Sequence, residues 1–518
     1  MKRFLSATAV LALTSGAAAA DFNLTILHTN DFHSRFEPIS KYDGPCPAED
    51  NAAGDCFGGT ARLVNAIKDA KSRSSNFVLV DGGDQFQGSL FYTRYKGKMA
   101  AEMMNMLGYD GMTVGNHEFD DGPEVLAGFM NEINFPILMS NADVSAEPLL
   151  AGKLARSAVI ERAGEPIGLI GLTTEDTPEL ASPGETVVFL DSVAAVQGEV
   201  DLLTARGVNK IIVLSHSGYG VDQMVAKNTT GVDVIVGGHS NSLLSNTNDR
   251  ADGPYPTMVN QTAIVQAYAY GKYLGELNVT FDDEGNVKQA SGEPVLIDGS
   301  TPEDEATLAR IAELAAPLEE IRNKVVANTT DPIDGDQAVC RIKECQMGNL
   351  VADAMLDRVA DQGIEVAIQN SGGLRASIDA GEVTMGEVLA VLPFQNTLST
   401  FQVSGAELIE ALENGVSQID KAAGRFPQVA GMTFTVDPKA DVGRRISDVT
   451  VSGMPIDPEK TYGMVSNNYV RNGGDGYATF KTAQNAYDYG PDLADVTAEF
   501  IAKNGDYTPY IDGRIKIK

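Results

Sequence analysis

The segment LTILHTNDFH, residues 24–33, joins a short apolar run directly to two side chains that commonly bind metal ions. Residues 24–27 have the apolar and β-branched character of a buried strand. Asp31 and His33 follow two positions apart, so both can face the same way where the strand ends. In open α/β sheets, functional sites assemble at the carboxyl ends of strands. The segment therefore predicts an α/β sheet with a polar site at its edge.

Four further apolar runs in the first part of the chain end in the same way. They are residues 77–80, 112–114, 211–214 and 232–236, and helical stretches separate them. This alternation predicts buried strands in an α/β domain. Potential ligands follow each run within a few residues, namely Asp81, Asp84, Asn116, His117, Glu118, Asp120, His216, His239 and Asn241. We expect these side chains to gather into one site, because the sheet edge collects the strand ends.

The donor atoms in these segments indicate the kind of metal. All five histidines of the chain lie in them, together with carboxylates and amides but no thiolate. This set suits zinc, manganese or cobalt. It is too large for one tetrahedral ion, so we expect two ions roughly 3.5–4 Å apart that share a carboxylate and activate water toward a phosphoryl group. His28 lies inside the first run rather than at its end, so we expect it to support the site or the fold rather than to bind metal.

Composition limits the class of protein. A chain of 518 residues exceeds one core and predicts two or three domains. Its net charge of −32 argues against non-specific binding to nucleic acid or anionic membranes. Residues 1–20 have the basic start, apolar middle and Ala-rich end of a secretory signal peptide. No later apolar run is long enough to span a bilayer, so we expect a periplasmic or secreted protein without a membrane anchor.

The four cysteines fall into two local pairs, Cys46 with Cys56 and Cys340 with Cys345. An even number of cysteines in an exported chain suggests disulfides, and the short loops favour these two pairings among three connectivities. Metal binding is the alternative, although the chain has no CxxC spacing.

Residues 301–326 have a helical pattern that we assign to a domain junction. Thr301 is the expected N-cap, Pro302 suits the first helical position, and Pro317 can kink the helix. The apolar positions recur at helical spacing and predict one buried face, made of Leu308, Ile311, Ala315, Leu318 and Ile321.

Beyond this junction, a second α/β segment starts at about residue 330. Residues 346–360 predict a helix. Residues 366–370 predict a strand that runs into a glycine turn.

Taken together, the motifs TILHTNDFHSRF, DGGDQFQGS, GNHEFDDG, VLSHSG and GGHSN resemble those of the calcineurin-like metallophosphoesterases. More narrowly, the chain resembles the exported 5′-nucleotidase and UDP-sugar hydrolase family, because CRIKECQMGNL, QNSGGLRASIDAG, VLPFQNTL and SNNYVRNGGDGY also fit. The resemblance implies a mixed α/β fold. It comprises a four-layered αββα metallophosphoesterase domain (21–300) after the signal peptide (1–20), a linker helix (301–328) and a smaller substrate-specificity domain (329–518). It also implies that the domains rotate to bring the substrate to the metals.

The resemblance implies a role for each polar residue of the strand ends. The ligands of two divalent ions, zinc first and manganese or cobalt as alternatives, would be Asp31, His33, Asp84, Asn116, His216, His239 and Asn241. Asp84 would bridge the ions, and Asn241 departs from the Gln of some members and has a shorter reach. His117 and Asp120 match the catalytic pair, in which the imidazole stays off the metal and stabilises the transition state.

The second half matches the family's substrate-binding positions. The matching residues are Arg341 and Arg375 on the phosphate or ribose side, Phe394 and Tyr469 as the aromatic pair that stacks the base, Asn370 and Asn468 near the sugar and base, and Asp475 at the ribose hydroxyls. Tyr469 departs from the Phe of many relatives, although a tyrosine ring also stacks.

The implied function is hydrolysis of nucleoside 5′-monophosphates to nucleoside and phosphate, with UDP-sugars or other nucleotides as further substrates. A 2′,3′-cyclic-nucleotide phosphodiesterase and a thiosulfate-ester hydrolase are alternatives on the same fold, and a non-catalytic surface or receptor protein is one from another class. The aromatic pair and Asp475 favour nucleotides, and the complete ligand set favours an enzyme.

Overall fold

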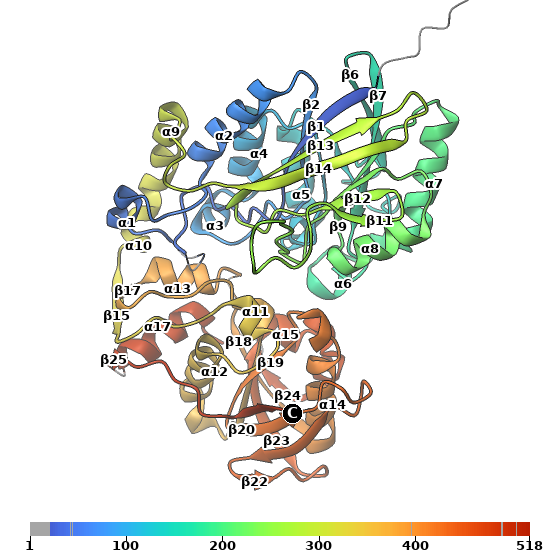
Figure 1. The fold of residues 1–518 in the computed structure, drawn as a ribbon. Coiled ribbons are helices and arrows are strands. Elements are labelled where there is room, and N and C mark those ends of the chain that lie inside the picture. The colour runs from blue at the N-terminus through green and yellow to red at the C-terminus, as the bar shows by residue number, and fades with distance from the viewer. Residues whose placement is uncertain (1–20, 42, 44, 395, 488–489, 504) are drawn as a thin grey trace, which may run out of the picture.

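The computed structural model describes residues 21–518 except 42, 44, 395, 488–489 and 504. The predicted signal peptide, residues 1–20, lies outside the described residues. Figure 1 shows an upper body made by the first part of the chain and a lower body made by the last part, joined at one side. Within the described part of the chain, none of the helices combines the length and apolarity that crossing a bilayer requires.

Two six-stranded sheets form the centre of the N-terminal body among the described residues. The first has the order β14-β13-β1-β2-β3-β4, with bounds Val287–Leu296, Tyr273–Phe281, Phe22–Thr29, Phe77–Asp81, Gly111–Thr113 and Ile137–Leu138. The second has the order β11-β12-β10-β9-β7-β6, with bounds Thr257–Val259, Thr262–Val265, Val234–Val236, Ile211–His216, Glu165–Thr173 and Ser157–Arg162. Strands β1 to β4 run parallel, as do β7, β9, β10 and β12. The parallel strands of each sheet therefore end at one edge.

The alternation of side chains along each strand produces four layers. Ile26 and Val78 of the first sheet pack against Ile212 and Val234 of the second in one buried cluster. Their neighbours in sequence face outward, where Leu27 and Leu79 contact helices α2 (Thr60–Arg73), α4 (Gly97–Leu107) and α5 (Gly122–Glu132). Helices α7 (Ser192–Ala205) and α8 (Tyr219–Asn228) cover the second sheet from its other side. The predicted αββα arrangement is therefore confirmed, and Figure 1 shows the two sheets between these helices.

The junction between the bodies is helical, but the helical part starts later and ends earlier than predicted, since residues 325–328 belong to strand β15 (Val325–Thr329). Helix α9 (Glu305–Ala315) is followed by a 3-10 turn, Ala316–Leu318, and by α10 (Glu319–Arg322). The N-cap is Asp304 rather than Thr301, because the Asp304 carboxylate accepts a hydrogen bond from Thr307 N and also binds Lys68 Nζ at 2.8 Å. Pro317 interrupts the helix as expected.

The predicted apolar face of this helix is only partly correct. Ile311, Ala315 and Leu318 are buried. Leu308 and Ile321 are 41% and 51% exposed. The 3-10 turn changes the angular spacing of the residues after Pro317, so Ile321 points to solvent rather than along the buried stripe.

The C-terminal body is built on a five-stranded sheet of order β19-β16-β23-β18-β24 among the described residues. Its strands are Pro427–Ala430, Val366–Asn370, Thr461–Asn467, Leu398–Ser404 and Gln484–Tyr487. Helices α12 (Gln346–Arg358) and α17 (Leu493–Lys503) pack on one side and α14 (Gly405–Val416) on the other. The predicted helix at 346–360 and strand at 366–370 are confirmed. Both predicted cysteine pairs are disulfides, Cys46–Cys56 and Cys340–Cys345.

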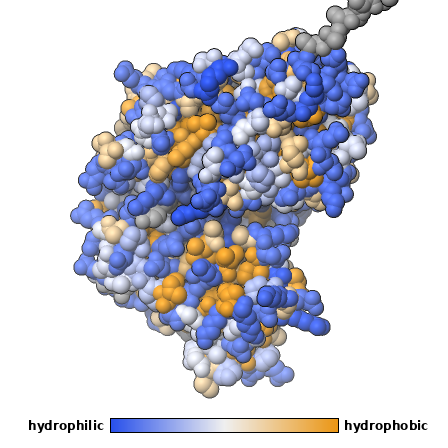
Figure 2. Space-filling view, viewed as in Figure 1, coloured by the Kyte–Doolittle hydropathy of each residue, from blue (hydrophilic) through white to orange (hydrophobic). Residues whose placement is uncertain are grey.

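Two smaller sheets and several short helices complete the described chain. The sheets are β22-β21-β20-β26 (Met454–Pro455, Ile446–Val451, Met432–Val436, Ile515–Ile517) and β17-β15-β25 (Gly381–Thr384, Val325–Thr329, Asp506–Tyr507), and β5 (Ala142–Asp143) pairs with β8 (Val188–Phe189). The short helices are α1 (Ala48–Ala53), α3 (Leu90–Tyr95), α6 (Thr177–Leu180), α11 (Gln337–Cys340), α13 (Met385–Val391), α15 (Asn468–Arg471) and α16 (Ala478–Lys481). Figure 2 shows a largely hydrophilic face, in keeping with the charge of −32, with apolar residues gathered on the lower body.

Candidate metal centre and active-site cleft

The predicted metal ligands come together where the parallel strands of both sheets end. Asp31 and His33 follow β1, Asp84 follows β2, and Asn116 follows β3. From the second sheet, His216 is the last residue of β9, and His239 and Asn241 follow β10. The strand-end segments are therefore close in space although they are up to about two hundred residues apart in sequence.

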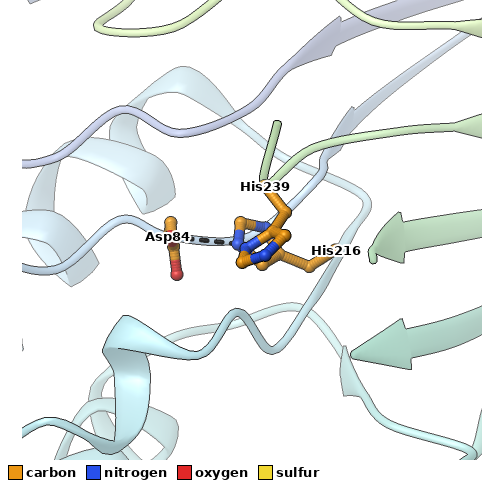
Figure 3. A group of neighbouring side chains, drawn as sticks. All are labelled: Asp84, His216 and His239. Atoms are coloured by element: carbon orange, nitrogen blue, oxygen red, sulfur yellow. Dashed lines mark ion pairs between the residues drawn. The ribbon is translucent and has the colours of Figure 1, made fainter. Parts of the chain in front are cut away.

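Asp84 lies at the centre of this cluster. Its Oδ2 is 3.0 Å from His216 Nε2 and 3.8 Å from His33 Nε2. Two groups of donor atoms, each within 4.8 Å, share Asp84: one includes Asp31 and His33, and the other His216 and His239. Figure 3 shows the side chains of the second group directed toward one another. A carboxylate common to both groups is the arrangement that a bridged pair of ions requires.

The loops that carry these residues adopt a conformation that only a tightly held backbone maintains. Asp31, His33, Asp84, His239 and Asn241 all have positive φ, between 50° and 71°. Such conformations cost energy for residues with a side chain and cluster at functional sites. Backbone hydrogen bonds tie the loops together, from Asp31 N to Gly83 O at 2.9 Å and from His33 N to Asp84 O at 3.0 Å. The first two loops thus hold each other in position.

The donor atoms fit divalent metal ions. Nδ1 of His33 lies 3.0 Å from Phe86 O, and Nδ1 of His216 lies 2.6 Å from Gly82 O, so the other ring nitrogen of each faces the cluster. Asn241 Oδ1 is buried and has no hydrogen-bond partner among the described residues, and His216 Nε2 faces Asp84 Oδ2 at 3.0 Å without an aligned hydrogen bond. Buried polar atoms without a partner are costly, and a metal ion would satisfy both. Imidazole, carboxylate and amide donors match the ions expected from the sequence.

The protonation states of the cluster residues depend on their burial and on the charges of the neighbouring histidines. Burial raises the pKa of Asp84, but His216, His117 and His33 outweigh it and hold that pKa well below its usual range. Burial lowers the pKa of His239 to about 3, so its ring is neutral and can bind a cation.

His117 and Asp120 form a pair beside the cluster. His117 Nδ1 lies 2.7 Å from Asp120 Oδ2, and His117 Nε2 is 4.0 Å from Asp84 Oδ2. Burial lowers the pKa of His117, but Asp120 and Asp84 outweigh it and raise that pKa above its ordinary value. The ring also stacks on Phe394 of the C-terminal body, with centroids 5.5 Å apart and planes at 21°. The pair can therefore present a protonated nitrogen to a negatively charged group.

The cleft between the two bodies holds the remaining predicted residues. It has a volume of about 2020 Å³, and its lining includes every residue of the metal cluster except the fully buried His216, together with Arg341, Asn370, Arg375, Phe394, Asn468, Tyr469 and Asp475. Arg375 bridges the two halves: its Nη2 is 3.1 Å from His33 Nε2, and its guanidinium lies over the Phe394 ring. Arg341 Nε is buried without a hydrogen-bond partner. Cations and aromatic rings thus border the cluster from the C-terminal side.

Comparison with known proteins gives the same assignment for both halves. Residues 24–242 match calcineurin-like phosphoesterases, and residues 325–482 match the 5′-nucleotidase C-terminal domain. The 5′-nucleotidase of Mus musculus is 38% identical over 96% of this chain and 91% of its own length. The snake venom 5′-nucleotidase of Gloydius brevicauda is 36% identical over 96% of this chain and 89% of its own. The chain belongs to the 5′-nucleotidase family.

A solved structure supports this membership for the fold as a whole. The 5′-nucleotidase precursor from Thermus thermophilus has a TM-score of 0.91 and 40% identity, and the match covers 96% of this chain and 99% of that one. As a member of the 5′-nucleotidase family, the chain is a metal-dependent phosphomonoester hydrolase that acts on nucleotides.

Sequence reasoning underestimated two buried residues of this family member. The carboxylate of Glu118 accepts hydrogen bonds from Gly115 N, Asp84 N and Gln85 N, so it ties the loops after β2 and β3 together. The Asn30 side chain donates to Asp31 Oδ2 at 2.7 Å and accepts from Ala267 N. Both were visible as polar residues beside the ligands, but their direction depends on loop geometry that a linear pattern does not contain.

A further missed residue is Arg35, which is only 5% exposed. Its guanidinium lies over the ring of Tyr270, and its Nε and Nη2 have no hydrogen-bond partner among the residues that the structure describes. Tyr270 in turn accepts a hydrogen bond from Gln337 Nε2 at 2.8 Å. The position of Arg35 two residues after His33, within the motif TILHTNDFHSRF, was its signal in the sequence.

Proposed function

We propose that this family member hydrolyses nucleoside 5′-monophosphates to nucleoside and inorganic phosphate. The observation that carries the proposal is the stacking of Phe394 on His117, with ring centroids 5.5 Å apart. An aromatic ring suited to a nucleobase is thereby next to the imidazole suited to a phosphoryl group. A phosphatase without preference for nucleosides has no need of such a ring.

We propose that two divalent ions are held by Asp31, His33, Asp84, Asn116, His216, His239 and Asn241, with Asp84 between them. Zinc is the first candidate and manganese or cobalt the alternatives, because nitrogen and oxygen donors without thiolate suit all three. When bound, the ions would polarise the phosphoryl oxygens and lower the pKa of water at the site. The contact of His216 Nε2 with the shared carboxylate of Asp84, and the Asn241 Oδ1 atom that has no partner among the described residues, support the assignment of these two residues.

In this account, His117 acts on the phosphoryl group and Asp120 orients it. The hydrogen bond at 2.7 Å to Asp120 uses His117 Nδ1 and leaves Nε2 as a donor for an oxygen that gains negative charge during the reaction. The carboxylate also favours the protonated ring, which makes that hydrogen bond stronger. Neither residue belongs to the two donor groups centred on Asp84.

Binding of the nucleotide would rest on the C-terminal side of the cleft. Arg341 and Arg375 supply local positive charge in a chain of net charge −32, and a guanidinium fork suits phosphate. Phe394 and Tyr469 would stack the base, with Asn468 at its edge. Asp475 and Asn370, which are hydrogen-bonded to each other at 2.6 Å, would take the ribose hydroxyls.

The alternative activities require different features of this cleft. A thiosulfate-ester hydrolase requires neither a base slot nor a carboxylate for ribose, so Phe394 and Asp475 favour a nucleotide. A 2′,3′-cyclic nucleotide leaves no free pair of ribose hydroxyls for Asp475. UDP-sugars remain further candidate substrates, because the cleft of about 2020 Å³ exceeds the volume of a nucleoside monophosphate. A non-catalytic receptor is disfavoured by the complete donor set.

We also propose that the protein works outside the cytoplasm, in the periplasm or secreted. Its two disulfides support this location, since such bonds persist in oxidising compartments.

A substrate panel tests the proposed function. We expect AMP to be hydrolysed with a far higher kcat/KM than 4-nitrophenyl phosphate, with other 5′-monophosphates, UDP-glucose and 2′,3′-cyclic AMP in the same panel. Equal kcat/KM values for AMP and the aryl phosphate would contradict a nucleoside-binding cleft. Faster hydrolysis of the cyclic nucleotide than of AMP would replace the proposal by the phosphodiesterase alternative.

A further inference from the structure

Among the described residues, the Tyr469 hydroxyl forms two hydrogen bonds with Asp475. Tyr469 lies in the short helix α15, and Asp475 lies six positions on, in the 3-10 turn Gly474–Gly476. The hydroxyl accepts a hydrogen bond from Asp475 N at 3.1 Å and donates one to Asp475 Oδ1 at 3.4 Å. It therefore touches both the backbone and the carboxylate of the residue assigned to the ribose.

Asp475 has a backbone conformation that needs such support. Its φ is 56°, in the left-handed region that residues with a side chain seldom adopt. The residue is only 4% exposed, so water has little access to its polar atoms. Asn414 Nδ2 donates to its carbonyl oxygen at 3.0 Å, and Asn370 Nδ2 donates to its Oδ2 at 2.6 Å. Within the described part of the chain, the contacts of its N–H and of Oδ1 come from Tyr469.

The tyrosine ring and the turn also pack as one unit. A Cβ atom added to Gly474 would lie 2.4 Å from Cζ of Tyr469, so only glycine allows the turn to approach the ring this closely. The hydroxyl is thereby brought to the turn by direct packing. Any motion of the Tyr469 ring moves a hydrogen-bond partner of Asp475.

We propose that the Tyr469 hydroxyl is a positioning group that sets recognition of the ribose through Asp475, in addition to the stacking role of its ring. This inference rests on the proposed function. From the described residues, each carboxylate oxygen of Asp475 accepts one hydrogen bond, Oδ2 from Asn370 and Oδ1 from Tyr469. The other lone pair of each oxygen is left for the 2′- and 3′-hydroxyls of a ribonucleotide.

Loss of the hydroxyl has a defined consequence. The Asp475 N–H would be buried without its hydrogen-bond partner. The carboxylate would also lose the hydrogen bond to Oδ1 that helps to fix its side-chain rotation. Stacking of the base would persist, because phenylalanine keeps the ring. The loss is therefore confined to substrates that offer hydroxyls to Asp475.

The test is the variant Tyr469→Phe with two substrates, AMP and 2′,3′-dideoxy-AMP. We expect kcat/KM for AMP to fall about two- to tenfold, the size of one weakened hydrogen bond between Asp475 and the ribose, with the change mainly in KM. We expect kcat/KM for dideoxy-AMP to equal that of the wild type, so the ratio of kcat/KM for AMP to that for dideoxy-AMP falls. In an Asp475→Asn background, Tyr469→Phe adds little further loss for AMP, because both changes disable the same contact.

Tyr510→Phe is the matched control. The Tyr510 hydroxyl also donates to a carboxylate of the same body, that of Asp353, but lies outside the cleft lining. We expect this variant to keep the wild-type ratio of AMP to dideoxy-AMP. A change of that ratio in Tyr510→Phe equal to that in Tyr469→Phe would overturn the inference, because the effect would then be a general one.

Other outcomes also overturn the inference. One is an unchanged ratio of kcat/KM for AMP to that for dideoxy-AMP in Tyr469→Phe. Another is an equal fall of kcat/KM on both substrates, which indicates a purely structural hydroxyl. A third is a wild type with equal kcat/KM for AMP and dideoxy-AMP. If one of these results is obtained and the wild type still prefers AMP to 4-nitrophenyl phosphate, only the inference fails and the proposed function stands. A wild type without that preference fails the proposed function itself, and the inference with it.

Discussion

His117 Nδ1 lies 2.7 Å from Asp120 Oδ2, while His117 Nε2 remains 4.0 Å from the shared carboxylate of Asp84. The ring is thus fixed from behind by one carboxylate and directed toward the metal cluster without entering either donor group. This separation of an orienting contact from a reacting atom is what a group acting on a phosphoryl oxygen needs.

Asp120→Asn tests the orienting contact. The amide oxygen of asparagine can still accept from His117 Nδ1, but it lacks the negative charge that favours the protonated ring. We expect kcat for AMP to fall about tenfold or more, with KM little changed and metal content unaltered. A kcat equal to that of the wild type would show that the charge of Asp120 has no part in the reaction.

Phe394→Ala tests the base slot. Stacking of one base on an aromatic ring contributes about 1–3 kcal/mol, so we expect kcat/KM for AMP to fall about five- to 150-fold. Hydrolysis of 4-nitrophenyl phosphate should fall far less. Phe394→Tyr is the control and should keep most of the activity on AMP. Parallel losses on both substrates in the alanine variant would indicate that Phe394 only supports His117, on which it stacks.

Removal of metal tests the donor cluster. The chelated protein should lose AMP hydrolysis, and return of zinc or manganese should restore it at about two ions per chain. Because the ions bind only the folded chain, the melting temperature should rise with metal concentration. Full hydrolysis of AMP by protein shown to be free of metal would refute this part of the account.

The burial of His28 predicts that the free energy of unfolding depends on pH, independently of catalysis. Its ring is fully buried on β1, its Nε2 lies 2.8 Å from Tyr255 Oη, and burial lowers its pKa to about 3. In the unfolded chain the ring takes up a proton below pH about 6.5, whereas in the folded chain it stays neutral. The stability linked to His28 is therefore complete above pH about 6.5 and is lost as the pH falls toward about 3.

Urea unfolding of His28→Gln and the wild type at several pH values checks this. Between the two pKa values, one proton contributes about 1.4 kcal/mol per pH unit, so the variant should show a shallower dependence by that amount. Identical slopes would mean that His28 does not remain neutral in the folded protein.

Much of the fold and the site could be predicted because short apolar runs and the polar residues that follow them are local features of the sequence. The runs before Asp31, Asp84 and His216 became β1, β2 and β9, and parallel pairing then put their ends at one edge. The cysteine pairs were similarly predictable, since a separation of 5 or 10 residues leaves few other partners.

Other features depend on tertiary contacts that no linear pattern contains. Asp304 rather than Thr301 caps α9, because Lys68 of α2 lies within 2.8 Å of its carboxylate. Likewise, the contact of Tyr469 with Asp475 follows from the left-handed turn at Asp475, and the sequence motif signals only that glycines surround it. Arg35 was overlooked because its burial under Tyr270 joins two segments far apart in the chain.

The most direct test of the account is the variant His117→Ala, with metal content and turnover of AMP measured on the same preparation. If His117 acts on the phosphoryl group without binding metal, this variant keeps about two ions per chain, as in the wild type, and loses about 10²- to 10⁴-fold in kcat. Asp84→Ala, by contrast, should lose metal, since both donor groups share that carboxylate. If His117→Ala lost metal in the same way, His117 would be a ligand, and the role assigned to it here would be wrong.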